Sequence, residues 1–468
     1  MRSVSPNETP PDMDVTRIRP RIAEILAAHQ TPGAAIGILH HGEVTELAFG
    51  VRDVMTREPV RTDTVFQCGS LTKSWTALAF MQLVDEGLVD LDAPVRTYLP
   101  DFEVADPYVS AAVTPRQLLN HTNGIEETYG DPGEGEDVYE RMVANIADAP
   151  QVSPLGHTHG YSAALGFAIL ARIMEVLDGT RWDAVMADRL FVPMGLTDTN
   201  SWRGDVDASR AATGHLIRSA EEGPVPTPVD YLPRAFGPGG NVTSTVREVL
   251  ALARVHLEGG VAPNGARIVS AAAIEEMMTS RVPVPDPYAF GPEWALGLVV
   301  CDWHGKTVYA HDGSTIGQNA RMRILPDDDM AIVLFTNGGQ RDALYREVFD
   351  EILSKLGAVT IPPLPEPDPE LVLDPSRYVG VYRRPGTTFE VTAVDGGLGL
   401  TVDLDPMQAA FMGLPDRITY DLLPISDTHF LMPPVVELED PQTVAIYDFA
   451  DGVAQYLHTN SRVHPRVR

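Results

Sequence analysis

The sequence contains little cysteine and comparatively little positive charge. Two cysteines, Cys68 and Cys301, occur among 468 residues, so we expect no disulfide framework and a reducing compartment. The 35 Lys and Arg residues are outnumbered by 65 Asp and Glu residues, which gives a formal net charge of −30. Because such a surface repels phosphate backbones and anionic lipids, we expect no nucleic-acid partner and no membrane partner.

Long apolar runs and a secretory leader are missing as well. No uninterrupted apolar stretch reaches the roughly 18 residues of a membrane-spanning helix. Residues 1–14 are polar and rich in proline, without the apolar centre of a signal peptide, and we expect them to be disordered. These absences and the few cysteines together predict a cytoplasmic protein.

The chain is long enough for more than one core, and its composition changes near residue 360. The linker 358–370 contains five prolines, which favour an extended, semi-rigid spacer. Beyond it, short alternating apolar runs separated by Gly-Gly and Asp-Gly pairs predict a small β-barrel or sandwich over 371–468. Residues 15–357 show helical and strand-like patterns together, which predicts an α/β body.

The first chemical motif is Ser70-Leu71-Thr72-Lys73, at the start of a helix predicted over 70–86. Residues i and i+3 of a helix lie on one face, about 5–6 Å apart. A serine hydroxyl becomes a good nucleophile when a neighbouring base takes its proton, and a buried lysine with a lowered pKa is such a base. The unpaired N–H of Ser70 at the helix start is also a candidate oxyanion donor. The alternative is a capping serine followed by a solvated lysine.

The second motif is Tyr161-Ser162-Ala163, which enters a helix predicted over 163–177. A phenol held near a lysine can move a proton between the nucleophile and the leaving group. The same segment is close to the nucleophile-elbow pattern, but Ala164 stands where that pattern needs glycine. We therefore expect Tyr161, and not Ser162, to take part in the chemistry, with an aromatic core residue as the alternative.

The third motif is His311-Asp312-Gly313, which follows a strand-like run over 307–310. The histidine could hold a substrate carboxylate or pass a proton, and the glycine lets a substrate backbone approach closely. The N–H of Ser314 would then be a second oxyanion donor. A strand-end turn with an exposed histidine is the alternative.

Two further interpretations, a cysteine nucleophile and a histidine metal site, have less support in the sequence. Cys68 precedes Ser70 by two residues, but no histidine partner is indicated, so we expect a small buried residue in the site wall. His157 and His159 lack a third ligand at the spacing of a zinc site. We expect no metal and no cofactor.

In their order and separation the three motifs resemble those of the class C β-lactamase and penicillin-binding serine hydrolase superfamily. The resemblance extends over about residues 15–357. Three further segments are similar to stretches common in that superfamily: Leu118–Ile125, Phe191–Leu196 and Gly239–Ser244. The resemblance implies an antiparallel sheet flanked by helices beside an all-helical region, with the site between the sheet and that region. It also implies Ser70 as the acylated residue, Lys73 as its base, Tyr161 as the proton relay and a lipocalin-like β-barrel after residue 371.

Two departures from the pattern narrow the expected activity. Ala163 stands in the third position of Tyr-x-Asn, so the amide that commonly orients the substrate carbonyl is missing. His311-Asp312-Gly313 replaces the Lys-Thr-Gly of true β-lactamases, as in the esterase, aminopeptidase and cyclase branches. We therefore expect Ala163, Gly313 and Ser314 to line a substrate site for which β-lactams are poor substrates.

Three functions remain open from the sequence. The first is a serine hydrolase that cleaves an ester or amide of a small molecule or peptide. The second is a transacylase or peptide cyclase of natural-product biosynthesis, such as antibiotic biosynthesis, which passes the acyl group to an amine acceptor. The third is a domain that binds acyl ligands without turnover, against which the intact Ser70, Lys73 and Tyr161 argue. The sequence does not indicate the oligomeric state.

Overall fold

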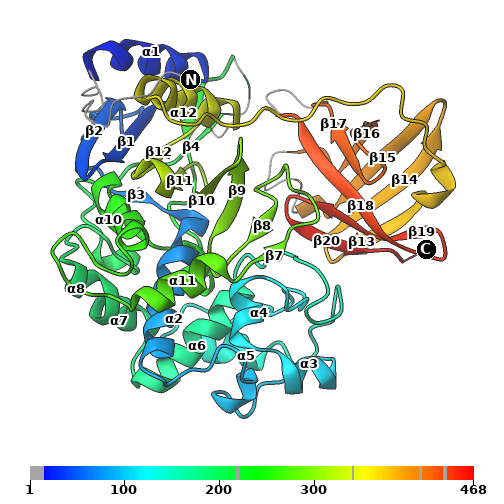
Figure 1. The fold of residues 1–468 in the computed structure, drawn as a ribbon, viewed down its shortest axis with the longest axis horizontal. Helices are drawn as coiled ribbons and strands as arrows, with labels where there is room; N and C mark the ends of the chain where they lie inside the picture. Colours follow the sequence, from blue (N-terminus) through cyan, green and yellow to red (C-terminus); the bar gives the residue numbers. More distant parts are fainter. Residues whose placement is uncertain are drawn as a thin grey trace, which may run out of the picture.

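The computed structural model describes residues 15–467, apart from 218, 220, 340–341, 408, 410–413 and 436–439. The disorder predicted for residues 1–14 falls outside this part of the chain. Figure 1 shows a large body of helices and strands with a separate all-β unit beside it, joined by an extended segment that follows the last helix of the body.

The body is built on one antiparallel sheet with the strand order β2-β1-β12-β11-β10-β9-β8-β7. β1 and β12 come from opposite ends of the body's sequence and pair with each other in the sheet. In this pair Ala34 lies opposite Thr336 and His40 opposite Met330. Every residue of β12 is buried, as expected for a central strand covered on both faces. The strands are β1 (Gly33–His40), β2 (Glu43–Gly50), β7 (Val282–Pro283), β8 (Glu293–Trp294), β9 (Val299–Trp303), β10 (Lys306–Ser314), β11 (Asn319–Leu325) and β12 (Met330–Thr336).

The sequence pattern predicts one strand of this sheet wrongly. The apolar run over residues 294–300 favours a single strand, but β8 ends at Trp294 and β9 begins at Val299. The chain turns between them, where Gly297 has φ +77° and Ala295 N–H donates to the Leu298 carbonyl. The apolar run therefore contains a buried turn between two paired strands. Periodicity alone does not distinguish such a turn from a continuous strand.

Helices cover both faces of the sheet (Figure 1). On one face α1 (Val15–Ala28) packs against α12 (Asp342–Leu356), and Ile18, Ile22 and Ile25 are buried at the helical spacing seen in the sequence. On the other face lie α10 (Val246–Leu257) and the helical region. The sheet therefore has apolar packing on both sides, in two separate clusters of buried residues.

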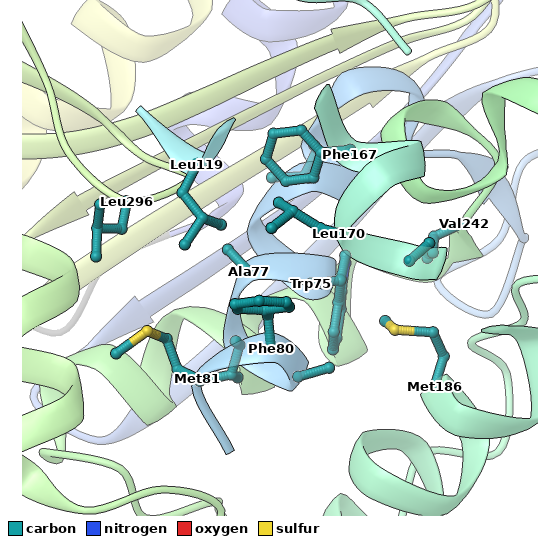
Figure 2. Close-up of a cluster of buried hydrophobic side chains, with 14 of the residues drawn as sticks. Trp75, Ala77, Phe80, Met81, Leu119, Phe167, Leu170, Met186, Val242 and Leu296 are labelled. Atoms are coloured by element: carbon teal, nitrogen blue, oxygen red, sulfur yellow. The ribbon is translucent and has the colours of Figure 1, made fainter. Parts of the chain in front are cut away.

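Helix α2 (Thr72–Asp85) is the centre of the helical region. Eleven of its fourteen residues are buried, so it has no polar face and must be surrounded on all sides. Figure 2 shows Trp75, Ala77 and Phe80 of this helix among apolar side chains from other helices and loops, including Phe167 and Leu170. The helices around it or farther out are α3 (Pro107–Ala112), α4 (Pro115–Leu119), α5 (Val138–Ala144), α6 (Leu165–Asp178), α7 (Trp182–Met186), α8 (Val192–Met194), α9 (Gly237–Gly240) and α11 (Ala271–Thr279).

Two short ribbons complete the body. β3 (Phe66–Gln67) pairs with β6 (Thr243–Ser244), and β4 (His215–Ile217) pairs with β5 (Pro224–Pro226). The first ribbon joins the segment before Ser70 to the segment after α9, so two parts of the chain that approach the sequence-predicted serine are held together.

The C-terminal unit is an eight-stranded antiparallel sheet in which each strand pairs with the next along the chain. A bridge between Tyr382 and Arg466 brings the last strand back to the first, so the sheet is nearly closed. Its interior is filled by large side chains such as Tyr378, Tyr382 and Phe430. We call it the C-terminal barrel: β13 (Gly380–Arg384), β14 (Thr387–Val394), β15 (Gly397–Leu404), β16 (Arg417–Pro424), β17 (His429–Met432), β18 (Gln442–Ala450), β19 (Val453–Thr459) and β20 (Arg462–Pro465).

The predicted fold class is confirmed: an antiparallel sheet with flanking helices, a helical region and a small C-terminal β-barrel. Within the described residues, none of the helices combines the length and the apolarity that crossing a membrane requires.

Candidate active site

Ser70 lies in a 3-10 turn (Gly69–Leu71) directly before α2, between the helical region and the sheet. The turn is tight because the chain must pass close to β10. Gly69 has φ +52°, and a Cβ at this position would lie 2.5 Å from the Ser314 nitrogen. The predicted helix start at Ser70 is thus a 3-10 turn, and the regular helix begins at Thr72.

Lys73 is completely buried one turn after Ser70. Its Nζ donates to the carbonyls of Ala163 (2.7 Å) and Gly239 (2.8 Å), and it lies 3.4 Å from Ser70 Oγ. Burial lowers the Lys73 pKa to about 7; the nearby charge of Glu127 opposes this shift and that of Arg462 adds to it. The three oxygens around the amine are all uncharged, so the neutral form is accessible near neutral pH.

Tyr161 lies against the same amine. Lys73 Nζ is 4.8 Å from the centre of the Tyr161 ring, and the Ser70 side chain is near enough to the phenol to lower its pKa against the larger effect of burial. Burial raises the Tyr161 pKa, so the hydroxyl is protonated at neutral pH. The Tyr161 backbone N–H donates to the carbonyl of Ser461 in the C-terminal barrel at 2.7 Å. The structure therefore brings Ser70, Lys73 and Tyr161 together, with Tyr161 tethered to the barrel.

The third motif lies on β10, which is longer than the sequence indicated. β10 pairs with β9 only as far as Ala310, so residues 311–314 pair with β11 alone. A Cβ on Gly313 would lie 1.9 Å from the Cys68 carbonyl oxygen and 2.8 Å from the Ser70 nitrogen. Only glycine fits here, which places the backbone of Gly313 and Ser314 directly against Ser70.

His311 is buried on this strand, and its ring does not line the cleft that contains Ser70. Its Nδ1 donates to the Asp312 carbonyl oxygen at 2.7 Å, and its ring packs edge-on against Trp294. Burial lowers the His311 pKa to about 4, with the charge of Lys73 acting in the same direction. The side chain is therefore neutral and lies behind the strand that borders the serine.

His121 lies on the other side of Tyr161 and is also completely buried. Its Nδ1 accepts a hydrogen bond from the Ser162 N–H at 3.1 Å, and its ring contacts those of Tyr161 and Trp294. Burial lowers its pKa well below the usual value. His121 thus holds the segment that carries Tyr161 through a backbone hydrogen bond and a ring contact.

Ala163 contributes its carbonyl to Lys73, and no side-chain amide is present at this position. Glu127 organises the segment instead. Its carboxylate accepts hydrogen bonds from Ser162 Oγ (2.7 Å), Ala164 N–H (2.9 Å) and Leu165 N–H (3.2 Å), at the start of α6. A carboxylate is favoured at a helix N-terminus because the free N–H groups point toward it.

Arg462, at the start of β20, brings a cation from the C-terminal barrel into the site. Its guanidinium lies 3.5 Å from the Glu127 carboxylate and 5.5 Å from the centre of the Tyr161 ring. Neither Arg462 nor Glu127 belongs to a sequence motif that points to the site. Glu127 lies in an acidic, glycine-rich loop, and no local pattern relates the last β-hairpin to the nucleophile.

A cleft of about 640 Å³ opens beside Ser70 and extends between the body and the barrel. This volume falls in the range typical of sites for small molecules, roughly 300–1,000 Å³. Ser70, Tyr161, Gly313 and Ser314 line one end. The remaining walls come from the loop between β7 and β8, from β9 to β11, from α12, from the linker and from the barrel: residues 287–292, 301–303, 312, 321, 323, 342–343, 345–346, 361–364, 440–443 and 460.

Within the described residues no group of three or more His, Cys, Asp and Glu side chains is placed to hold a metal ion. His157 pairs with Asp448 of the barrel at 2.9 Å, and His159 packs against Trp294. Cys68 is buried beside the serine, and burial raises the pKa of its thiol.

Comparison with known proteins points to one family. The model of the family described as Beta-lactamase matches residues 18–356. The chain is 39% identical over 373 residues to penicillin-binding protein 4 of Amycolatopsis lactamdurans, which covers 78% of this chain and 97% of that protein.

Solved structures resemble the whole chain or the body. The crystal structure of SurE superposes with a TM-score of 0.79 at 26% identity, over 97% of this chain and 98% of that one. The structure of SurE with D-Leu also matches, with a TM-score of 0.75 at 25% identity, over 97% of this chain and 99% of that one. D-amino acid amidase from Ochrobactrum anthropi SV3, with 23% identity and a TM-score of 0.62, shares the fold over 73% of this chain and 99% of its own.

Proposed function

The chain belongs to the beta-lactamase family of serine hydrolases, and from this premise we propose that Ser70 attacks the carbonyl of an ester or amide and forms an acyl-enzyme. The observation that carries the proposal is the burial of Lys73 beside Ser70 and the lowered pKa of its amine. A buried amine with a pKa of about 7, 3.4 Å from Ser70 Oγ, accepts the hydroxyl proton when the serine attacks.

Tyr161 completes the proton path. Ser70 Oγ forms the new bond to the carbonyl carbon, and its proton passes to Lys73 Nζ. When the tetrahedral intermediate collapses, the bond to the leaving oxygen or nitrogen breaks, and that atom takes the Tyr161 proton. Lys73 then returns its proton to the phenolate, against whose ring it lies. In deacylation water replaces the leaving group and the transfers run in reverse.

The backbone beside the serine stabilises the negative charge that develops on the carbonyl oxygen. The Ser70 and Ser314 N–H groups are the proposed donors, brought together by the close approach of β10 at Gly313. His311 supports the strand from behind through its bond to the Asp312 carbonyl. Its role in this proposal is to position β10, since the ring is buried and is not among the side chains that line the cleft.

The proposed substrate is an ester or amide of a small molecule or peptide. The cleft volume and its mixture of aromatic, proline and charged lining residues support this size and chemistry. The missing amide at Ala163 and the His311-Asp312-Gly313 motif support a substrate other than a β-lactam. Because SurE was solved with D-Leu, substrates of both configurations belong in the first assay.

A second candidate is transfer of the acyl group to an amine. The cleft continues past Ser70 under the barrel, which supports binding of an acceptor while the acyl-enzyme exists. The same Lys73 and Tyr161 would then take the proton from the attacking amine. Hydrolysis and transfer differ in the acceptor alone, and both need acylation of Ser70.

Hydrolysis of p-nitrophenyl esters of D- and L-amino acids tests the proposal. We expect release of p-nitrophenol by the wild type, none above background by Ser70→Ala, and unchanged rates for Ser209→Ala, which alters an exposed serine. Turnover by Ser70→Ala would refute the mechanism. Adding D-leucinamide during turnover separates the two candidates, because a transacylase forms amide product in competition with free acid.

A further inference from the structure

The loop between β7 and β8, residues 284–292, forms an apolar wall of the cleft. Its base is closed by a hydrogen bond from Val284 N–H to the Pro292 carbonyl at 2.9 Å. Residues 287–292 all line the cleft. Phe290 lies nearly parallel to Tyr161, with 6.2 Å between ring centres, so this wall stands directly beside the catalytic end.

The body holds the second half of this loop through contacts with β9. Cys301 Sγ on β9 contacts the Phe290 carbonyl at 3.4 Å. Gly291 packs so closely against β9 that a Cβ would lie 2.8 Å from the Val300 oxygen. These contacts set the distance of Phe290 from the sheet, but they leave the first half of the loop to other partners.

The C-terminal barrel holds the first half. Asp286 is completely buried, and its carboxylate accepts the Thr443 hydroxyl from β18, at 3.0 Å and 2.8 Å from the two oxygens. His429 Nε2 of β17 donates to the Pro285 carbonyl at 2.9 Å, and the Tyr288 ring meets the His429 ring edge-on. Within the loop the Asp286 carboxylate also accepts the Tyr288 N–H at 3.1 Å, so the Thr443 hydroxyl is the donor that ties it to the barrel. A buried carboxylate is costly unless it is fully hydrogen-bonded, so removing the Thr443 hydroxyl favours movement of Asp286 and its loop away from the barrel.

We propose that Thr443 is a positioning residue through which the barrel sets the selectivity of the cleft for substrates with a large apolar acyl group. The inference rests on the proposed function, since it concerns the same cleft. By fixing Asp286, Thr443 keeps the wall of Pro287, Tyr288 and Phe290 at the distance that encloses such a group. The acyl part stays bonded to Ser70 while the leaving group departs, so the wall beside Ser70 and Tyr161 contacts the acyl part.

Thr443→Val removes the hydroxyl and keeps the shape, and Thr443→Ser keeps the hydroxyl. Thr401→Val is the matched control, because the Thr401 hydroxyl bonds the Thr419 hydroxyl between two strands of the barrel itself. The measurements are kcat and KM for p-nitrophenyl 4-phenylbutyrate and p-nitrophenyl acetate, which share a leaving group. Binding of 4-phenylbutyramide is measured in a Ser70→Ala background by calorimetry.

We expect Thr443→Val to lower the phenylbutyrate-to-acetate ratio of kcat/KM by about 10-fold, through KM, and to weaken amide binding similarly. Thr443→Ser restores both values, and Thr401→Val changes neither. A parallel fall for both esters, an unchanged ratio, or a Thr443→Ser variant that behaves like Thr443→Val would overturn the inference. The binding measurement does not need turnover, so failure of the Ser70 mechanism and failure of this inference give different results.

Discussion

The Arg462 guanidinium lies 3.5 Å from the Glu127 carboxylate, although 335 residues separate them in the sequence. Arg462 comes from the C-terminal barrel and Glu127 from the loop before α5. Both charges act on Lys73: Glu127 raises the pKa of the amine and Arg462 lowers it. The protonation state of the proposed base therefore depends on a residue of each unit.

Substituting Arg462 by glutamine should move the activity profile toward higher pH. The positive charge of Arg462 disfavours the protonated Lys73 amine, and glutamine carries no such charge. The Lys73 pKa therefore rises, and a larger fraction of Lys73 is protonated at pH 7. Since the base must be neutral, the acid limb of kcat/KM shifts upward. The pH dependence of ester hydrolysis measures this shift.

Substituting Glu127 by glutamine should move the same limb in the opposite direction. Loss of the negative charge lowers the Lys73 pKa, while the amide oxygen still accepts from Ser162 and from the start of α6. The two variants are controls for each other, because each of them removes the ion pair between Arg462 and Glu127. If both variants moved the acid limb of kcat/KM in the same direction, the effect would be structural and not electrostatic.

Tyr161→Phe should lower kcat/KM by about 10²–10⁴, since the leaving group loses its proton donor. The backbone bond to Ser461 and the ring contact with Lys73 do not need the hydroxyl and should persist. The loss should be smaller for p-nitrophenyl esters, whose leaving group needs little protonation, than for anilides. Equal losses for both substrate types would contradict the proton-relay role.

Gly313→Ala should abolish activity and destabilise the protein. The new Cβ would overlap the Cys68 carbonyl and press on the Ser70 nitrogen, so β10 and the nucleophile turn must separate. Overpacking of this kind costs about 1–3 kcal/mol, which thermal unfolding would report. The same substitution at Gly397, where a Cβ meets no atom within 4 Å and φ is not positive, is the control for the steric effect at Gly313. A fully active Gly313→Ala enzyme would exclude the proposed oxyanion geometry.

Cys68 should resist alkylation in the native protein although it lies two residues from Ser70. Its side chain is buried and burial raises the pKa of its thiol, so little thiolate is present at neutral pH. Iodoacetamide at pH 8 should label Cys68 after denaturation and not before, as read by mass spectrometry. Rapid native labelling would show that this thiol is an accessible and competing nucleophile.

Local patterns in the sequence indicated the helices beside Ser70, Lys73 and Tyr161, because the first motif runs into α2 and the second lies just before α6. The resemblance to the penicillin-binding and β-lactamase superfamily is confirmed by the family match. Periodicity did not separate β8 from β9, because the turn at Gly297 is as buried and apolar as the strands beside it. The short alternating runs of the C-terminal sequence likewise do not mark β16, β17 and β20 as separate strands.

The contributions of the barrel to the site could not be predicted from local sequence. Arg462 approaches Glu127, and Thr443 approaches Asp286, because the barrel docks on the body, and docking depends on the whole folded surface. An arginine that follows Asn460-Ser461 in a hairpin is typical of a solvated turn. Its position beside Tyr161 becomes apparent only when both units are placed together.

Labelling with a fluorophosphonate, followed by peptide mapping, tests the central claim most directly. The reagent reacts with an activated serine without needing the natural substrate. We predict a single adduct on Ser70, formed at a rate that rises with pH through about 7 as Lys73 loses its proton, and lost in Lys73→Met. An adduct on Ser162 or another residue, or no adduct at any pH, would contradict the account.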